Sequence, residues 1–176
     1  FGAASKSSRR PSVLIIGTTK LKALARKPKM AEAKVDAVLI EVDDAEEQLW
    51  DKALSHIGNT LWGIRSHGIS SDSLDKLIEQ GCDFLIFEPK SSEASILNRD
   101  SLGKVVMVEP GIDQDKTAAI HSLALDAVLY EKVVLGEMMT IGDLFDLARV
   151  RAQLGIPILV STSRPIIPSE ITPLRE

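Results

Sequence analysis

Short apolar segments recur along the chain, and each is bounded by polar or turn-forming residues. Their continuous Val, Ile and Leu content is typical of buried strands with both faces covered. The pattern predicts strands at residues 13–17, 36–41, 60–66, 83–88, 104–109, 126–131 and 157–162. Between them, apolar residues recur with a period of about 3.6 residues. This spacing predicts helices at residues 20–33, 45–57, 71–80, 92–98, 114–124 and 141–154. Strand and helix therefore alternate, which implies parallel strands joined by right-handed crossovers.

Polar residues and glycines mark where several of these helices begin and end. Asp44, Ser70 and Thr140 each stand just before a helical pattern, where a side-chain oxygen can cap the first free N–H groups. Gly81 and Gly155 stand just after such patterns, at the position that favours glycine.

One six-residue pattern occurs three times: an acidic residue, four apolar residues and a glutamate. Its copies cover residues 36–41, 83–88 and 126–131, and their starts lie 47 and 43 residues apart. That spacing equals about two strand–helix units, so the pattern falls on alternate strands. Alternate strands of a closed barrel contribute side chains to the same interior layer, so a barrel gives the repeat a geometric cause.

Two stretches in which a helix ends in glycine shortly before the next strand are similar to those of TIM-type (β/α) barrels. They read Leu77-Ile-Glu-Gln-Gly81-Cys-Asp-Phe-Leu-Ile86 and Leu154-Gly-Ile-Pro-Ile-Leu-Val-Ser161. The order of units resembles the TIM-barrel superfamily over residues 12–176, without pointing to one family. We therefore expect an α/β fold, a parallel TIM-type barrel with seven visible strands. The eighth strand is either missing or lies beyond residue 176. An open doubly wound α/β sheet is the alternative.

Length and composition favour one folded unit. With 176 residues and 44% hydrophobic composition, we expect a single barrel-like domain over residues 12–176. Residues 1–11 are rich in serine and are interpreted as a disordered leader or one added for expression. The apolar runs are far shorter than the ~20 residues that span a bilayer, and no secretory signal is visible, so a cytoplasmic protein without membrane contact is expected. The single cysteine, Cys82, is interpreted as a small core residue.

The net charge of −4 is unevenly distributed. Residues 1–34 carry about +8 and the rest about −12. The basic stretch is either a solvated tail with the outer face of a helix, or a contact for a phosphate-bearing partner or an acidic neighbouring subunit. Nucleic acid is not expected as a partner, because no aromatic residues interleave the charges. A homo-oligomer remains a candidate, and residues 133–140 are interpreted as a lid or a patch that meets another subunit.

Strand parity predicts where the glutamates point. If Glu41 faces the barrel axis, so do Ala37 and Leu39, while Val38 and Ile40 face the helices. The opposite choice would bury an unpaired carboxylate under the helical layer at a large cost in free energy. The same argument applies to Glu88, Glu109 and Glu131, so four glutamates are expected at one mouth of the barrel. Asp36, Asp83 and Asp126 begin their strands at the opposite end and are interpreted as loop or cap residues.

Four carboxylates at one mouth raise one another's pKa unless cations compensate them. Mg²⁺ or Mn²⁺, with Glu109 and Glu131 as candidate ligands, would do so, although the sequence does not identify a cofactor. Basic residues at strand ends, such as Arg65 and Lys132, would do so too. A structural ring of ion pairs fits the pattern equally well.

Arg65 and His67 share the inward parity of Gly63, which leaves room inside the barrel for a long neighbouring side chain or a ligand. An arginine and a histidine together can hold a carboxylate or phosphate and exchange a proton. Ser161, Ser163 and Arg164 follow the seventh strand, where small barrels often bind phosphate, although the glycine-rich turn is missing.

Two functions remain open. The first is a metal-assisted lyase, aldolase or isomerase that acts on a small carboxylated or phosphorylated metabolite. Its candidate catalytic residues are Glu41, Glu88, Glu109, Glu131, His67 and Lys132, and its candidate substrate-binding residues are Arg65, Ser161, Ser163 and Arg164. The second is a noncatalytic barrel that serves as a binding or assembly module, with the glutamates in structural ion pairs.

Overall fold

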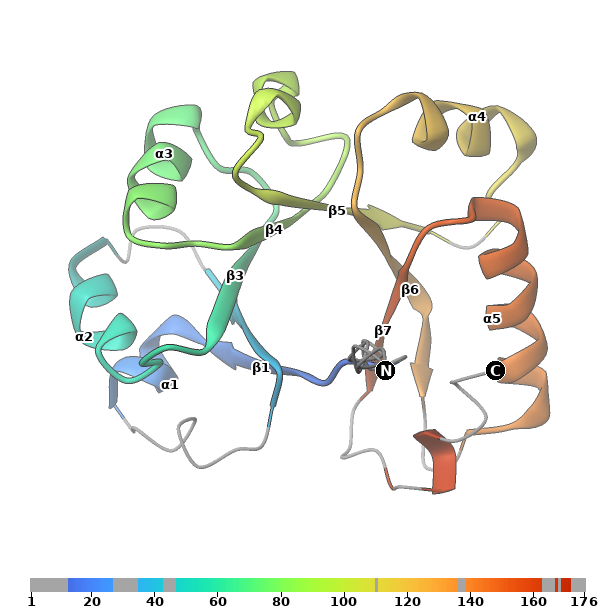
Figure 1. The fold of residues 1–176 in the computed structure, drawn as a ribbon, viewed down its shortest axis with the longest axis horizontal. Coiled ribbons are helices and arrows are strands. Elements are labelled where there is room, and N and C mark those ends of the chain that lie inside the picture. The colour runs from blue at the N-terminus through green and yellow to red at the C-terminus, as the bar shows by residue number, and fades with distance from the viewer. Residues whose placement is uncertain are drawn as a thin grey trace, which may run out of the picture.

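A computed structural model of the chain describes residues 13–26, 35–42, 47–109, 111–135, 139–162, 167 and 169–171. Its strands are β1 (Ile16–Lys20), β2 (Ala37–Glu41), β3 (Leu61–Ser66), β4 (Phe84–Phe87), β5 (Gly103–Val108), β6 (Ala127–Leu135) and β7 (Ile158–Thr162). They form one parallel sheet whose order follows the sequence from β1 to β7. Figure 1 shows the sheet curled around a common centre with the helices outside. The fold is therefore of the TIM-barrel type. The doubly wound alternative is wrong, because its strand order would reverse at a switch point.

The helices cover the outer surface of the sheet. They are α1 (Leu21–Arg26), η2 (Glu47–Leu49), α2 (Trp50–Leu54), α3 (Ser71–Glu79), η3 (Ala94–Asn98), α4 (Gln114–Ser122) and α5 (Ile141–Leu154). The predicted helix at residues 92–98 is the 3₁₀ helix η3. Nowhere in the described part of the chain is a helix both long and apolar enough to cross a membrane.

The predicted helix caps are found where the structure describes them. The Ser70 side chain accepts a hydrogen bond from the N–H of Ser73. Thr140 and Asp143 form a capping box at the start of α5, and the hydrogen bonds from the Thr140 backbone and hydroxyl lower the pKa of Asp143. Gly155 ends α5 with a φ of 63°. Asp44 lies outside the described residues, and α2 begins after Leu49 without a side-chain cap.

The first strand differs from the sequence prediction. The apolar run predicts residues 13–17, whereas β1 covers residues 16–20 and pairs through Thr18 and Thr19 with Leu39 and Ile40 of β2. As an edge strand, β1 needs backbone pairing on one side only, so apolar content does not fix its bounds. β6 is also longer than predicted and continues to Leu135, so residues 133–135 belong to a strand, whereas residues 136–138 lie outside the described residues.

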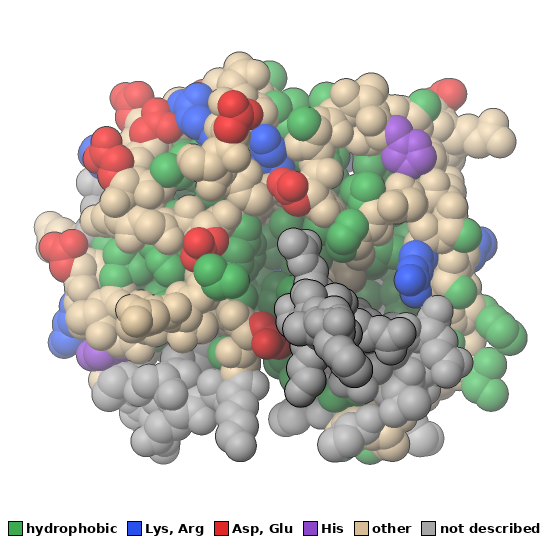
Figure 2. Space-filling view, viewed as in Figure 1, with side chains coloured by type: hydrophobic (Ala, Val, Ile, Leu, Met, Phe, Trp, Pro, Cys, Tyr) green, Lys and Arg blue, Asp and Glu red, His purple; other side chains and the backbone are tan. Residues whose placement is uncertain are grey.

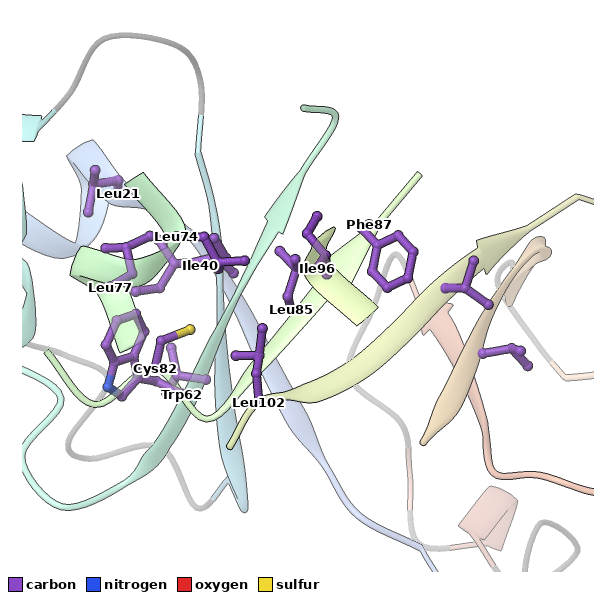
Figure 3. Close-up of a cluster of buried hydrophobic side chains, with 14 of the residues drawn as sticks. Leu21, Ile40, Trp62, Leu74, Leu77, Cys82, Leu85, Phe87, Ile96 and Leu102 are labelled. Atoms are coloured by element: carbon purple, nitrogen blue, oxygen red, sulfur yellow. The ribbon is translucent and has the colours of Figure 1, made fainter. Parts of the chain in front are cut away.

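The apolar side chains form two clusters that the parity argument predicted. Val38 and Ile40 lie in the outer cluster, between the sheet and the helices, whereas Leu39 lies in the inner cluster. Figure 3 shows part of the outer cluster, including Ile40, Trp62 and Leu85. The inner cluster consists of Leu39, Ile86, Val105, Met107, Ala127 and Leu129. The inward parity of Glu41 is therefore confirmed.

Gly63 allows a close approach inside the barrel. A Cβ atom at this position would stand 2.3 Å from the Phe84 carbonyl oxygen and 2.5 Å from atoms of the Phe84 ring. The room expected beside Gly63 is therefore occupied by Phe84, its neighbour on β4.

The aspartate that opens each copy of the repeat holds the start of the preceding strand. Its carboxylate accepts a hydrogen bond from the backbone N–H of one residue near the start of that strand. Its own backbone N–H donates to the carbonyl oxygen of that strand residue. The carboxylate bonds are Ile15 to Asp36 at 2.8 Å, Trp62 to Asp83 at 2.9 Å and Lys104 to Asp126 at 2.7 Å. The return bonds from Asp36, Asp83 and Asp126 measure 2.8, 2.8 and 2.9 Å. The repeat thus joins β1 to β2, β3 to β4 and β5 to β6, which gives the predicted loop or cap residues a defined role.

Candidate functional site

Three of the predicted site residues meet at the carboxyl ends of β2 and β3. Glu41 is the last residue of β2 and pairs in register with Arg65 of β3. His67 follows β3 directly. Glu41, Val42, Arg65 and His67 line a cavity of about 260 Å³. In TIM barrels this end of the strands carries the active site.

Arg65 forms an ion pair with Glu131 across the barrel. Its Nη2 lies 2.5 Å from Glu131 Oε1, and the two side chains are 23% and 36% exposed. Arg65 Nε is buried and has no hydrogen-bond partner within the described part of the chain. One edge of the guanidinium is therefore held by Glu131, whereas Nε has unused hydrogen-bonding capacity.

His67 and Glu88 form a second pair on the loops after β3 and β4. Nδ1 of His67 lies 3.5 Å from Oε2 of Glu88. The Ser91 hydroxyl donates to the same Oε2 at 3.2 Å. Glu88 stands two residues after Ile86 of the inner cluster, so it has the inward parity that the sequence predicted. A carboxylate at Nδ1 favours the tautomer that carries the proton there, which leaves Nε2 as a proton acceptor.

Polar contacts between α3 and η3 hold these two loops together. The Ser71 hydroxyl donates to Glu93 at 2.9 Å. Arg99 binds both carboxylate oxygens of Asp75, through Nε at 2.7 Å and Nη2 at 2.9 Å. The Asp75 carboxylate raises the pKa of the Arg99 guanidinium. Because α3 follows His67 and η3 follows Glu88, these bonds connect the two segments that come after the paired side chains.

Other predicted site residues are not brought into contact with these groups. Glu109 is exposed and has neither a hydrogen bond nor an ion pair to any described residue. Ser161 is exposed on β7. Lys132 lies on β6, but its side chain is outside the description, as are Ser163 and Arg164 entirely. No group of at least three His, Cys, Asp or Glu residues in the described ranges is placed to hold a metal ion. Metal binding by Glu109 and Glu131 therefore stays a prediction.

The site also contains residues that the sequence reasoning missed. Val42 forms one wall of the cavity and Ser91 holds Glu88. Neither carries a chemical pattern that a single sequence reveals. The other two histidines contact backbone carbonyl oxygens. His56 Nδ1 lies 2.9 Å from the Leu24 carbonyl oxygen, and His121 Nε2 lies 2.7 Å from that of Leu154.

The single cysteine of the chain lies in the hydrophobic core rather than at the candidate site. Cys82 is 4% exposed and lies in the outer cluster, as expected for a core residue. Burial raises the pKa of its thiol to about 12. A thiol with so high a pKa is neither a nucleophile nor a metal ligand near neutral pH.

The sequential parallel sheet and the ionisable cavity at its carboxyl edge define an α/β protein of the TIM-barrel type. Apolar side chains are visible toward the centre of the ring in Figure 2, whereas charged side chains gather over the helices and loops around it. The fold is also found in solved structures of low sequence identity.

Three structures represent the likeness. The YdjI aldolase from Escherichia coli K12 matches with a TM-score of 0.56 at 11% identity, over 93% of this chain and 72% of that one. The 2-keto-3-deoxy-6-phospho-gluconate aldolase from Zymomonas mobilis matches with a TM-score of 0.56 at 12% identity, over 89% and 74%. The 7,8-dihydropteroate synthase from Vibrio fischeri ES114 matches with a TM-score of 0.55 at 16% identity, over 84% and 72%. At these identities the likeness establishes the fold alone. No protein-family model matches the sequence, and no curated protein sequence matches it.

Proposed function

We propose that the cavity lined by Glu41, Arg65 and His67 binds a small carboxylated or phosphorylated metabolite, on which the chain acts as a lyase, aldolase or isomerase. One observation carries the proposal: a guanidinium, an imidazole and a carboxylate meet in one cavity at the carboxyl ends of the strands. Similar folds that include two aldolases, one of them named for a phosphorylated sugar acid, support the class of substrate.

Arg65 is the group that would bind the anion. A guanidinium offers a planar fork of donors that matches carboxylate and phosphate oxygens. Because Glu131 accepts from Nη2, the anion would use Nε and the remaining donors of the same side chain. An anion there would accept a hydrogen bond from the buried Nε, which has no partner among the described residues. This new hydrogen bond favours binding.

His67 and Glu41 would exchange protons with the bound metabolite. Glu88 would orient His67 through Nδ1, so Nε2 could take a proton from a carbon next to a carbonyl. Glu41 has no hydrogen-bond partner among the described residues, so its carboxylate is available as a second proton acceptor. A divalent metal at Glu109 and Glu131 would have to compete with Arg65 for the Glu131 carboxylate.

Calorimetric titration with inorganic phosphate and with pyruvate tests the binding step. We expect Arg65→Gln to weaken binding by about 10-fold to 100-fold, which corresponds to one lost charge-assisted hydrogen bond. Arg149→Gln is the matched control, because Arg149 is 69% exposed on α5 and pairs only with Asp146 in the described structure. Equal weakening by both substitutions, or no binding to the unsubstituted chain, contradicts the proposal.

The noncatalytic alternative is favoured by a different observation. Arg65 and His67 each already have a carboxylate partner, Glu131 for Arg65 and Glu88 for His67. Such pairing is also expected of a structural ion-pair network.

Proton exchange in D₂O separates the two functions. An enzyme of the proposed class would speed deuterium incorporation at the methyl group of pyruvate, observed by proton NMR, and His67→Gln would abolish the acceleration. A binding module would bind pyruvate without accelerating the exchange.

A further inference from the structure

Glu41 and Arg65 stand side by side in the candidate cavity without forming an ion pair. The two residues are register partners on β2 and β3, and both line the cavity. Neighbouring strands lie about 4.8 Å apart, which is close enough for a glutamate and an arginine to meet. Yet Arg65 pairs with Glu131 on β6 instead, and Glu41 has neither a hydrogen bond nor an ion pair to any described residue. Two opposite charges on adjacent strands are therefore held apart.

The two side chains leave complementary hydrogen-bonding groups unused. Nε of Arg65 is buried and donates to no atom in the described part of the chain, so it needs an acceptor. The Glu41 carboxylate can only accept hydrogen bonds, and a cationic donor gives it the strongest ones. A ligand that bridges the two must therefore present an anionic acceptor to Arg65 and a cationic donor to Glu41.

The charge balance of the cavity disfavours an anion alone. Glu131 already offsets the charge of Arg65, and Glu88 stands beside His67. A carboxylate or phosphate at Nε would therefore lie near the uncompensated carboxylate of Glu41, and like charges in a partly buried cavity repel. A dianionic phosphate would meet more of this repulsion than a carboxylate. A positive group on the same ligand, placed beside Glu41, would turn the repulsion into attraction.

We propose that the cavity takes an amino carboxylate, whose carboxylate binds Nε of Arg65 and whose ammonium group binds Glu41. This inference rests on the proposed function and narrows its ligand from anionic metabolites in general to zwitterionic ones. In an α-amino acid the two charged groups are carried by adjacent carbon atoms, a spacing that suits partners on neighbouring strands. One molecule then satisfies both unused groups. His67, oriented by Glu88, is left as the proton acceptor beside the ligand.

L-Alanine and pyruvate are a matched pair of probes. They share a three-carbon skeleton and a carboxylate, and they differ in carrying an ammonium or a keto group. Calorimetric titration of the full chain should show that alanine binds about 10-fold to 100-fold more tightly, which is the effect of one charge-assisted hydrogen bond. Arg65→Gln should weaken the binding of both ligands by a similar factor, because both use the guanidinium.

Glu41→Gln should change the two affinities in opposite directions. Alanine should bind about 10-fold to 100-fold more weakly, because its ammonium group loses the carboxylate. Pyruvate should bind more tightly, because a repelling charge is removed. A purely structural role of Glu41 would move both affinities in the same direction. Glu79→Gln is the matched control, because Glu79 is exposed at the end of α3 and lies outside the residues that line the cavity, so it should change neither affinity.

The outcomes separate this inference from the proposed function. If pyruvate binds as tightly as alanine, or if Glu41→Gln affects the two ligands alike, the inference is overturned and the anion site at Arg65 stands. If neither ligand binds, both are overturned. The comparison of the two ligands on the unsubstituted chain requires no variant, so it decides the matter even where Glu41→Gln does not fold.

Discussion

Arg65 and Glu131 lie 66 positions apart in the sequence, yet their side chains meet at 2.5 Å. The strands that carry them, β3 and β6, are not neighbours in the sheet, so the ion pair crosses the interior of the barrel rather than following its wall. It lies on the carboxyl side of the inner cluster, where Ile86 and Leu129 close the apolar core. The pair therefore ties opposite walls of the barrel together at the proposed binding cavity.

Removal of this pair should show measurable coupling between the two side chains. In a double-mutant cycle of Arg65→Gln and Glu131→Gln, we expect a coupling free energy of about 1 kcal/mol, because both groups are partly exposed and solvent screens them. The same cycle on Asp146 and Arg149, an exposed pair within one helix, should give only about 0.3–0.5 kcal/mol. Urea unfolding of the variants measures both. Equal coupling free energies in the two cycles would mean that the ion pair across the barrel is no stronger than the exposed pair within one helix.

The aspartates of the repeat should differ in importance according to what they satisfy. Asp126→Ala leaves the backbone N–H of Lys104 unsatisfied, and Lys104 is only 6% exposed. We expect a loss of about 1–3 kcal/mol in the free energy of unfolding. Asp36→Ala should cost less, because Ile15 is 42% exposed and water can replace the carboxylate.

Two further variants make this comparison specific. Asp126→Asn retains an acceptor oxygen and should lose less stability than Asp126→Ala. Asp100→Ala changes an exposed aspartate in the loop before β5 and should be nearly neutral. If chemical denaturation shows a larger loss of stability for Asp36→Ala than for Asp126→Ala, burial of the N–H donor does not decide the cost.

The parts of the fold that sequence patterns predicted are those that local physics determines. Side chains alternate across a strand, so the cost of burying Glu41 beneath the helices was enough to place Leu39 inside the barrel and Ile40 outside. The cap at Thr140 was visible in the sequence for the same reason, because a helix cap involves neighbours in the sequence.

What escaped prediction depends on contacts between distant segments. Register places Glu41 beside Arg65, but the guanidinium instead bonds Glu131 on the opposite wall, and only the curvature of the sheet brings the two together. β1 shifted because an edge strand is selected by pairing with β2 rather than by its apolar content. Phe84 filled the space beside Gly63 because the register of β3 and β4 sets these residues side by side, and the sequence could not distinguish that neighbour from a ligand.

The absence of a side chain at Gly63 should be essential to the packing of the barrel interior. Gly63→Ala would place a methyl group 2.3 Å from the carbonyl oxygen of Phe84, and a backbone atom in a central strand cannot move aside cheaply. We expect a loss of about 1–3 kcal/mol in the free energy of unfolding. Gly111→Ala is not a suitable control because its φ is 84°, whereas Gly142→Ala is, since its Cβ would lie 3.5 Å from the nearest atom. Thermal unfolding of both variants should show a large loss only for Gly63→Ala, and a further Phe84→Ala change should not restore it, because the closest atom belongs to the backbone.

The Cys82 thiol should make stability depend on alkaline pH. Burial raises its pKa from 9.0 to about 12 in the folded chain, so the unfolded chain loses this proton at a lower pH than the folded chain does. A raised folded pKa means that the stability linked to the thiol is complete below about pH 9 and declines as the pH rises toward about 12. Other groups also titrate in this range, so the measured quantity is the difference between the unfolding curves of the unsubstituted chain and Cys82→Ala. We expect the stability advantage of cysteine over alanine to shrink steadily across that range.

In the folded chain at neutral pH, the thiol should also react with a thiol-specific disulfide reagent only as fast as the chain unfolds. Rapid labelling under native conditions would show that the thiol is accessible. A stability difference between the two chains that stays constant with pH would show that folding does not raise the pKa of the thiol.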